Sequence, residues 1–207
     1  MAAERLGAKY QPENEDDQKA FTTYIDTIIR QVDDIGRLVN EFSSFARMPA
    51  PVMENHDLIE IASSQVALMK PAHRDIVFKT ITHGHGELVI SCDDGLIRQA
   101  ITNLLQNAIE AMEEAKIKAK TISSEMRQQE HHIAIKIIDN GPGLPGENSS
   151  ELTKPYVTHR EKGTGLGLAI VAKIIEDHSG ELVLGQADKS DPLNGASVTM
   201  LFPHRLT

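Results

Sequence analysis

Cysteine, tryptophan and long apolar runs are scarce or absent in this sequence of 207 residues. The single cysteine is Cys92, so no internal disulfide can form, which excludes disulfide-stapled secreted folds and fits a reducing compartment. No stretch approaches the roughly 18 consecutive apolar residues that cross a bilayer, and the first residues lack a signal-peptide pattern. The net charge of −9 leaves no basic surface, which argues against nucleic acid as a partner.

What the sequence does contain is an ordinary globular composition, with 40% hydrophobic and 25% charged residues. Apolar residues recur at steps of three and four over 17–47, which predicts a long amphipathic helix. One helix cannot bury such a stripe alone, so we expect either a symmetric dimer or an internal core helix. Pro49 and Pro51 end the pattern and separate a helical part, 1–50, from a larger domain, 51–207.

The larger domain alternates helical and strand patterns. His83–Gly86 predicts a hairpin turn between the first two strands, and the polar stretch 116–130 predicts an exposed loop or a frayed helix end. The two histidines of that turn lack companion ligands, so no metal site is expected there. Helix patterns cover 58–69, 94–115 and 167–178, and strand patterns cover 76–82, 87–92, 133–139, 181–186 and 196–202.

Two asparagines, Asn103 and Asn107, lie four residues apart on the helix predicted over 94–115, where they interrupt an apolar face. Buried amides need partners, and an amide carbonyl is an oxygen ligand suited to Mg²⁺. The alternative interpretation is a pair of exposed asparagines with no ligand.

Asp139 ends a predicted strand and is followed by the turn residues Asn140-Gly141-Pro142-Gly143. A carboxylate at a strand end can accept a hydrogen bond from an exocyclic amine, such as that of adenine. We expect Thr199, on the last predicted strand, to add a hydroxyl to the same pocket. Taken alone, Asp139 is better interpreted as the start of a turn.

Glycines occupy alternate positions in Gly163-Thr164-Gly165-Leu166-Gly167, directly before an apolar helical pattern. Glycine backbone can approach an anion closely, and the following helix offers unpaired amides and a positive dipole end. Lys154, His159, Arg160 and Lys162 would make the region locally positive for a polyphosphate. A plain loop-to-helix turn is the alternative. A dinucleotide-binding loop is set aside, because no buried strand precedes the glycines and their spacing is not G-x-G-x-x-G.

In combination and order, these motifs resemble the catalytic, ATP-binding domain of bacterial sensor histidine kinases, in the Bergerat-fold superfamily with Hsp90-type, gyrase and MutL ATPases. The matching segments are Asn103–Ala111 (N box), Asp139–Gly143 (first glycine box), Lys154–Thr158 (F box) and Gly163–Leu168 (second glycine box). The resemblance covers 55–204. It implies an α+β fold, a two-layer α/β sandwich in which helices cover one face of a mixed sheet, preceded by a long α-helical dimerization hairpin segment.

The resemblance also implies the composition of the site. It gives catalytic roles to Asn103 and Asn107, with Asn107 holding Mg²⁺ on ATP, and it makes Asp139 the residue that recognises adenine. The sector 148–162 would be a mobile lid over ATP, anchored by Tyr156. The implied ATP-binding set is Asn107, Ala111, Asp139, Gly141, Gly143, Leu144, Tyr156, Thr158, Arg160, Lys162, Gly163, Thr164, Gly165, Leu166, Gly167, Leu168 and Thr199.

Residues 27–49 resemble the second helix of the dimerization and phosphoacceptor hairpin, most closely that of nitrogen-regulation kinases of the NtrY/NtrB type. This implies an ATP-dependent protein-histidine kinase that forms a homodimer and works with a response regulator of the NtrX/NtrC type. The full-length protein would be anchored in the bacterial inner membrane through other segments, with this part in the cytoplasm.

Two departures from the family pattern modify these expectations. Three positions after Asn107, where many relatives carry a basic residue, the sequence has Glu110, so a phosphate contact would come from elsewhere, such as Arg160. The nine histidines begin at His56, so the phosphoacceptor motif is absent and the chain is expected to begin just after it. We therefore expect the chain to bind ATP but not to phosphorylate itself on the usual residue.

Asn103 also bears on the class of reaction. The ATPase branches of the superfamily carry at this position a glutamate that acts as a general base for water. An amide cannot take a proton, which favours phosphoryl transfer over hydrolysis. A GHKL-type ATPase and a non-catalytic nucleotide-sensing scaffold are the alternatives.

Overall fold

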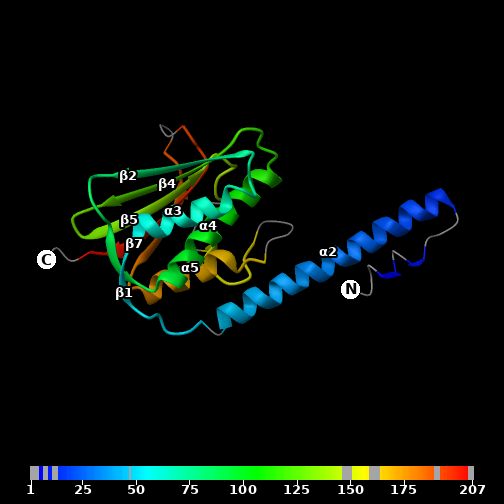
Figure 1. Cartoon of the computed structure of the whole chain (residues 1–207), viewed down its shortest axis with the longest axis horizontal. Coiled ribbons are helices and arrows are strands. Elements are labelled where there is room, and N and C mark those ends of the chain that lie inside the picture. Colours follow the sequence, from blue (N-terminus) through cyan, green and yellow to red (C-terminus); the bar gives the residue numbers. More distant parts are fainter. Residues whose placement is uncertain are drawn as a thin grey trace. The chain divides into compact units, whose positions relative to one another are not determined.

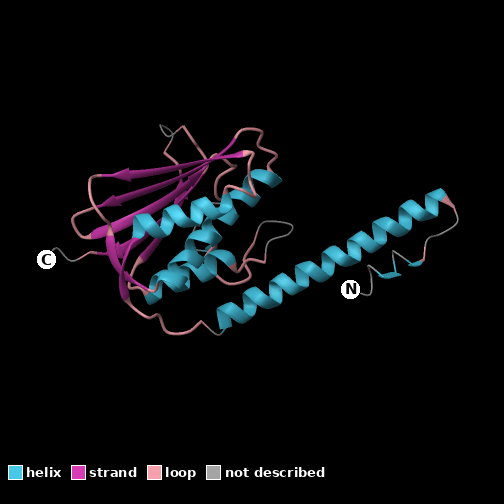
Figure 2. Cartoon of the chain, viewed as in Figure 1, coloured by secondary structure: helices cyan, strands magenta, loops and turns pink. Residues whose placement is uncertain are grey.

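The computed structural model describes residues 5–6, 9–10, 14–46, 48–145, 151–158, 164–188 and 192–204. The chain divides into two compact units, Met1–Met48 and Pro49–Thr207. Figure 1 labels the elements along the chain, and Figure 2 distinguishes helices from strands and loops. The division falls at the proline-containing segment that follows the long helix.

The first unit is built on helix α2, Glu15–Ala46, which confirms the predicted amphipathic helix. Asn14 begins it, because its Oδ1 accepts hydrogen bonds from the amides of Asp16 and Asp17 at 2.8 and 3.3 Å. The 32 residues correspond to a length of about 48 Å at a rise of 1.5 Å per residue. The apolar stripe is exposed in the single chain at Ile28, Val32, Ile35, Leu38, Val39 and Phe42.

The length of α2 does not make it a membrane helix, because only one side of it is apolar and charged residues occur along its whole sequence. None of the helices in the described part of the chain combines the length and the apolar character that crossing a membrane requires.

The second unit is organised around a mixed sheet. In the part of the chain that the structure describes, its strands lie in the order β2-β4-β5-β7-β6. β2 and β4 are parallel, whereas the other neighbouring strands are antiparallel. The strands are β2 Ile76–His83, β4 Lys120–Gln128, β5 His132–Asp139, β6 Glu181–Gln186 and β7 Ala196–Pro203.

Three helices cover one face of this sheet (Figure 2), as expected for a two-layer α/β sandwich. They are α3 Leu58–Met69, α4 Asp94–Glu114 and α5 Gly167–Asp177. α4 packs against both of the others, so it is the central helix of the layer. Its apolar side, including Leu105 and Ile109, is buried together with Ile135 of β5 and Phe202 of β7. Burying a side chain of this size contributes about 1.5–3 kcal/mol.

The hairpin predicted around His83–Gly86 is wrong. β3, Val89–Cys92, pairs with β1, Glu54–Asp57, in a separate two-stranded antiparallel sheet. β2 pairs instead with β4, which comes much later in the chain. Apolar alternation identifies a strand but not its partner, and the polar sequence of β1 gave no signal for the strand that β3 pairs with.

The loop predicted over 116–130 is also wrong, because most of this stretch forms β4. Its residues Ile122 and Met126 are buried on one face, but the residue between them on that face is Ser124, so the apolar alternation of a strand is broken. Between them, Ser123 and Ser124 are buried. Small hydroxyl side chains fit a central strand although they make its sequence look like a loop.

Candidate nucleotide-binding site

The amides of the N box lie on α4 where this helix meets the start of α5. The Nδ2 atom of Asn103 is buried, and no described group lies within hydrogen-bond distance of it. The carboxamide of Asn107 lies against Gly167, the first residue of α5, so that a Cβ at Gly167 would come within 3.5 Å of both its Oδ1 and Nδ2. Ala111 follows one turn later and is half-buried. The sequence prediction that both asparagines share a face is confirmed.

Asp139 is buried, with 5% of its surface exposed, at the carboxyl end of β5. Its Oδ1 accepts hydrogen bonds from the amides of Gly141 and Ala196 at 2.8 and 3.3 Å. Its carbonyl accepts another from Gly195 at 3.1 Å. These backbone contacts from two segments hold the carboxyl group in one orientation. The first glycine box also touches α4, because a Cβ at Gly141 would lie 3.3 Å from Cγ of Met112.

Asn140 fixes the turn that carries Asp139, a role that the sequence prediction missed. Its Oδ1 accepts from the amide of Thr121 at 2.9 Å, and its Nδ2 donates to the carbonyl of Ala119 at 2.7 Å. The side chain thus continues the ladder between β4 and β5 beyond the end of the strand. The partners could not be predicted, because β4 itself was interpreted as a loop.

The next glycine, Gly143, ends the first glycine box and lies before the predicted lid sector. Gly143 has a φ of +84°, and the side-chain amide of Gln186 occupies the space where a Cβ would be. Gln186, the last residue of β6, donates from Nε2 to the carbonyl of Leu144 at 2.8 Å. The side chain of Gln186 therefore holds the chain as it leaves the first glycine box. No sequence signal distinguishes this glutamine from other polar residues at strand ends.

The F-box segment contacts the second glycine loop. The amide of Tyr156 donates to the carbonyl of Gly165 at 3.1 Å. A Cβ at Gly165 would lie 2.7 Å from the carbonyl carbon of Tyr156, so only glycine fits. The tyrosine side chain is exposed, as is the neighbouring Thr158. Two of the predicted motifs are thus joined through their backbones.

The start of α5 offers backbone amides. Leu166 is buried at the N-cap position, and within the described residues this helix has no side-chain cap and no acidic residue in its first turn. Thr164 holds the segment that leads into α5, because its Oγ1 accepts a hydrogen bond from the amide of Leu166 at 3.3 Å. Leu168, in the first turn, is half-buried. An uncapped helix start with a positive dipole end is suited to an anion.

Several predicted residues lie outside the described part of the chain. They include the basic residues Arg160 and Lys162, the neighbouring His159, and Gly163. Of the lid sector predicted over 148–162, only 151–158 lies within the described residues. The predictions for these residues therefore stay predictions.

Thr199 does not join this group, so its predicted place beside Asp139 is wrong. In the register of β5 and β7, Thr199 lies opposite Lys136, three residues before Asp139. Side chains alternate along a strand, so Lys136 and Thr199 share the sheet face opposite to that of Asp139. The backbone of Gly195 and Ala196 occupies the position beside Asp139 that the sequence suggested for Thr199.

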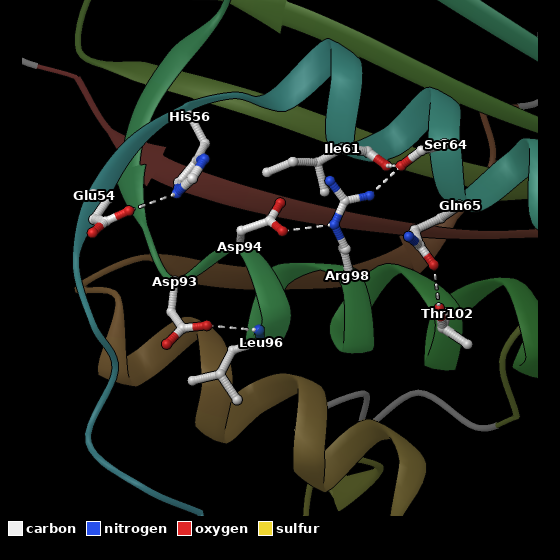
Figure 3. A network of polar contacts seen from close by, with 10 residues as sticks. All are labelled: Glu54, His56, Ile61, Ser64, Gln65, Asp93, Asp94, Leu96, Arg98 and Thr102. Carbon is white, nitrogen blue, oxygen red and sulfur yellow. Dashed lines mark hydrogen bonds and ion pairs between the residues drawn. The ribbon is translucent and has the colours of Figure 1, made fainter.

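The N-terminus of α4, in contrast to that of α5, is closed by a side chain. Asp93 Oδ1 accepts from the amide of Leu96 at 3.1 Å, as Figure 3 shows, and its Oδ2 accepts from the amide of Val52 at 3.0 Å. The bond from Val52, followed by that from Leu96, lowers the pKa of Asp93. Burial raises the pKa of the adjacent Cys92 to about 12. α4 is therefore anchored firmly where it starts.

The four motifs all lie within one matched family. The family model described as histidine kinase-, DNA gyrase B-, and HSP90-like ATPase matches residues 92–206, which begin at the last residue of β3 and include α4, α5 and β7.

Two curated relatives are described as NtrY or NtrY-like. The nitrogen regulation protein NtrY of Azorhizobium caulinodans is 45% identical over 190 residues, covering 90% of this chain and 24% of that protein. A putative sensor histidine kinase of Rickettsia bellii, described as NtrY-like, is 39% identical over 182 residues, covering 88% of this chain and 29% of that protein. The chain therefore spans roughly a quarter of the length of these relatives.

Solved structures agree with this family. The catalytic domain of histidine kinase ThkA, in a nucleotide-free form, is 28% identical, with a TM-score of 0.64 over 73% of this chain and 95% of that one. ThkA in complex with the response regulator TrrA is 22% identical, with a TM-score of 0.73 over 97% of this chain and 55% of that one, and shows the fold alone. These matches confirm the resemblance drawn from the sequence. The chain belongs to the family of histidine kinase-, DNA gyrase B- and HSP90-like ATPases, and it is homologous to sensor histidine kinases of the NtrY type.

Proposed function

We propose that this chain is the catalytic, ATP-binding part of a two-component protein-histidine kinase, active in nitrogen-related signalling. One observation carries the proposal: α4 contacts both glycine boxes, through Asn107 at Gly167 and through Met112 at Gly141. The buried Asp139 lies beside the second of these contacts. In the whole kinase, the γ-phosphoryl group of ATP passes to a histidine of the dimerization hairpin and then to an aspartate of the response regulator.

The residues present fit ATP with Mg²⁺. The buried Nδ2 of Asn103 has no partner in the described chain, and the start of α5 carries no capping side chain in the described residues. A polyphosphate and its metal would satisfy such groups. The donor set is amide oxygens and backbone amides, which suits a hard cation and phosphate oxygens rather than a soft metal.

Each part has a role in positioning. Asp139 accepts a hydrogen bond from the exocyclic amine of adenine and so selects the base. Asn107 supplies an amide oxygen to Mg²⁺, and Asn103 supports it from one turn before. The loop at Gly165 and the first turn of α5 bind phosphate oxygens through backbone amides. Bound ATP and Mg²⁺ supply the phosphoryl group and the neutralising charge, so the protein contributes mainly orientation and electrostatics.

The basic residues near the second glycine box complete the proposed site. Arg160 and Lys162 contact the phosphates and replace the basic side chain that Glu110 does not provide. In the structure, the carboxylate of Glu110 accepts a hydrogen bond from Nε2 of Gln106, one turn earlier on α4, at 2.9 Å. The lid over 148–162 closes on the nucleotide, with Tyr156 beside the loop.

The proposed reaction is transfer rather than hydrolysis. Asn103 occupies the position where a general base for water would be, and an amide cannot accept the proton. An ATPase of the GHKL type, or a scaffold that only senses nucleotide, is the second candidate. A steady-state assay of phosphate release separates the first of these from a kinase, because a kinase without its phosphoacceptor releases phosphate slowly.

The exposed stripe of α2 supports a homodimer through this helix. Residues such as Ile28 and Ile35 are 48% and 61% exposed in the single chain, and a partner helix would bury them.

The protein that receives the phosphoryl group from the active kinase is a response regulator of the NtrX/NtrC type. We place this part of the protein in the cytoplasm and the membrane anchor of the full-length protein in other segments.

This chain is not expected to phosphorylate itself on the usual residue. α2 contains no histidine, and the first histidine of the sequence is His56 in β1. Incubation with ATP labelled at the γ position should therefore leave no stable acid-labile label on this chain alone. Adding a peptide of the first hairpin helix, with its histidine, should allow labelling of that peptide if the catalytic part is competent.

Calorimetric titration with Mg-ATP tests the proposal, using the wild type and Asp139→Asn. Because Oδ1 stays bound to the amides of Gly141 and Ala196, the substituted group would present NH₂ to the donor amine of adenine. Losing a charge-assisted hydrogen bond costs about 2 kcal/mol, or roughly thirtyfold in affinity. Wild type that gives no heat with saturating Mg-ATP would rule out the site.

A further inference from the structure

His178 connects the two helices of the site at the end remote from the glycine loop. It follows the last residue of α5 and is 3% exposed. Its Nε2 lies 2.9 Å from the amide nitrogen of Asp93, and its Nδ1 lies 2.6 Å from the carbonyl oxygen of Ile174. The amide can only donate, so Nε2 is the acceptor and the proton of the neutral ring is on Nδ1. The imidazole is therefore fixed in one tautomer.

The residue that His178 binds is the one that begins α4. The carboxylate of Asp93 caps this helix by accepting a hydrogen bond from the amide of Leu96 (Figure 3). It also accepts a hydrogen bond from the amide of Val52, in the segment that precedes β1. Asp93 thus joins the first turn of α4, the end of α5 and the segment around Val52. Moving His178 would move the first turn of α4 relative to the end of α5.

The same two helices meet again at the nucleotide site. There a Cβ added at Gly167, at the start of α5, would lie 3.5 Å from the side-chain amide of Asn107 on α4, so the two positions face each other closely. α5 has 11 residues, a length of about 16 Å at 1.5 Å per residue, and behaves as a short rigid rod. Two points fix the placement of such a rod, and the contact of Asn107 with Gly167 and the bond of His178 to Asp93 are those two points.

We propose that His178 is a positioning residue of the nucleotide site. Its neutral ring sets the separation of α4 and α5, and so keeps the amide of Asn107 in register with the phosphate-binding turn of α5. A misplacement of about 1 Å in such a site lowers function strongly, up to a hundredfold. The inference rests on the proposed nucleotide function and extends it to a residue outside the binding motifs.

The test compares His178→Phe with His178→Gln. Phenylalanine keeps the ring but leaves the amide of Asp93 buried without an acceptor, so the affinity for Mg-ATP measured by calorimetry should fall about tenfold or more. The Oε1 of glutamine can take the place of Nε2, so His178→Gln should recover affinity to within about threefold of wild type.

Thr102→Val is the matched control. It removes the hydrogen bond from Thr102 Oγ1 to Gln65 Oε1, 3.1 Å long, which joins α4 to α3 (Figure 3) and leaves the junction with α5 unchanged. This variant should lose stability but keep its affinity for Mg-ATP. If Thr102→Val loses as much affinity as His178→Phe, the effect is one of general stability and the positioning role is wrong.

Nitrogen NMR of the wild-type imidazole provides a second measurement if His178→Phe does not fold. It should show Nδ1 protonated and Nε2 unprotonated, with a through-hydrogen-bond coupling from Nε2 to the amide of Asp93. A proton on Nε2 would overturn the inference, as would wild-type affinity in a folded His178→Phe variant. Wild type that does not bind Mg-ATP would overturn the proposed function and the inference together, so the two failures are distinguishable.

Discussion

Tyr156 and Gly165 hold each other in the left-handed backbone conformation, with φ angles of 67° and 70° and a hydrogen bond of 3.1 Å from the amide of Tyr156 to the carbonyl of Gly165. A tyrosine in this conformation is strained, and such strain persists only where the surroundings impose it. The carbonyl of Gly165 provides that constraint. The F box and the second glycine box therefore form one structural unit, and a change in either should be felt in the other.

Gly165→Ala should weaken nucleotide binding while leaving most of the fold intact. The new Cβ would lie 2.7 Å from the backbone of Tyr156, and alanine disfavours positive φ by about 1–2 kcal/mol. The loop must then shift, so the affinity for Mg-ATP should fall tenfold or more by calorimetry. Gly185→Ala, at a position in β6 with open space around it, is the control and should bind normally. Equal affinities for both variants would contradict the contact.

Gln186→Glu should loosen the segment that leads from the first glycine box to the lid sector. The glutamine donates to the carbonyl of Leu144, whereas a carboxylate would face that oxygen with like charge and no proton to donate. Hydrogen–deuterium exchange at the amides of Gly143 and Leu144 should accelerate severalfold, and Gln186→Ala should give a smaller change, because it only removes the bond. If exchange in this segment is the same in all three proteins, Gln186 does not hold it.

The cap of α4 should make stability depend on pH in the acid range. The folded protein lowers the pKa of Asp93 from its ordinary value of 3.8, chiefly through the amide of Val52. The carboxylate therefore stabilises the fold above pH 3.8, and this contribution is lost as the pH falls through the lower folded pKa. Urea unfolding of wild type and Asp93→Asn, from neutral pH downward, should show a difference that shrinks in this window.

Asp75 provides the comparison for that experiment. Its pKa is lowered chiefly by a hydrogen bond from the side chain of Lys120, at the surface. Salt screens such an exposed pair, whereas the bonds to Asp93 come from backbone amides. Added salt should therefore reduce the effect of Asp75→Asn and leave that of Asp93→Asn in place. The opposite pattern would show that the cap is mainly an effect of long-range charge.

The exposed stripe of α2 should determine the oligomeric state. Ile28→Glu places a charge in the stripe, so a dimer held through this helix should dissociate in sedimentation velocity experiments. Thr23→Glu adds the same charge on the opposite side of the helix and should leave the dimer intact. A wild-type chain that sediments as a monomer, or two variants that behave alike, would exclude this interface.

The sequence was most informative where one side of an element is apolar and the other polar. α4 and α5 were predicted within a few residues, because their apolar positions recur with helical spacing and glycine or aspartate marks their starts. β5 was predicted for the same reason, from Ile133, Ile135 and Ile137. The resemblance assigned Asn107 and Gly167 to one nucleotide site, and the structure brings these two positions close together.

The parts that the sequence did not predict are those set by pairing across the sheet. β4 was missed because two buried serines replace apolar residues in a central strand, and β1 because its four residues are polar. Thr199 was placed on the wrong face because its side relative to Asp139 follows from the register of β7 against β5, which the sequence does not show. Asn140 and Gln186 were missed because their partners are backbone atoms distant in sequence.

The pairing of β5 with β7 has a consequence for how such a domain can vary over evolution. These strands are neighbours in the sheet, yet the chain between them, 140–195, contains both glycine boxes, the lid sector, α5 and β6. The entropy of closing so long a segment changes by only about 0.6 kcal/mol when its length doubles. Lids of different length and composition can therefore be exchanged in this interval with little effect on the central strands.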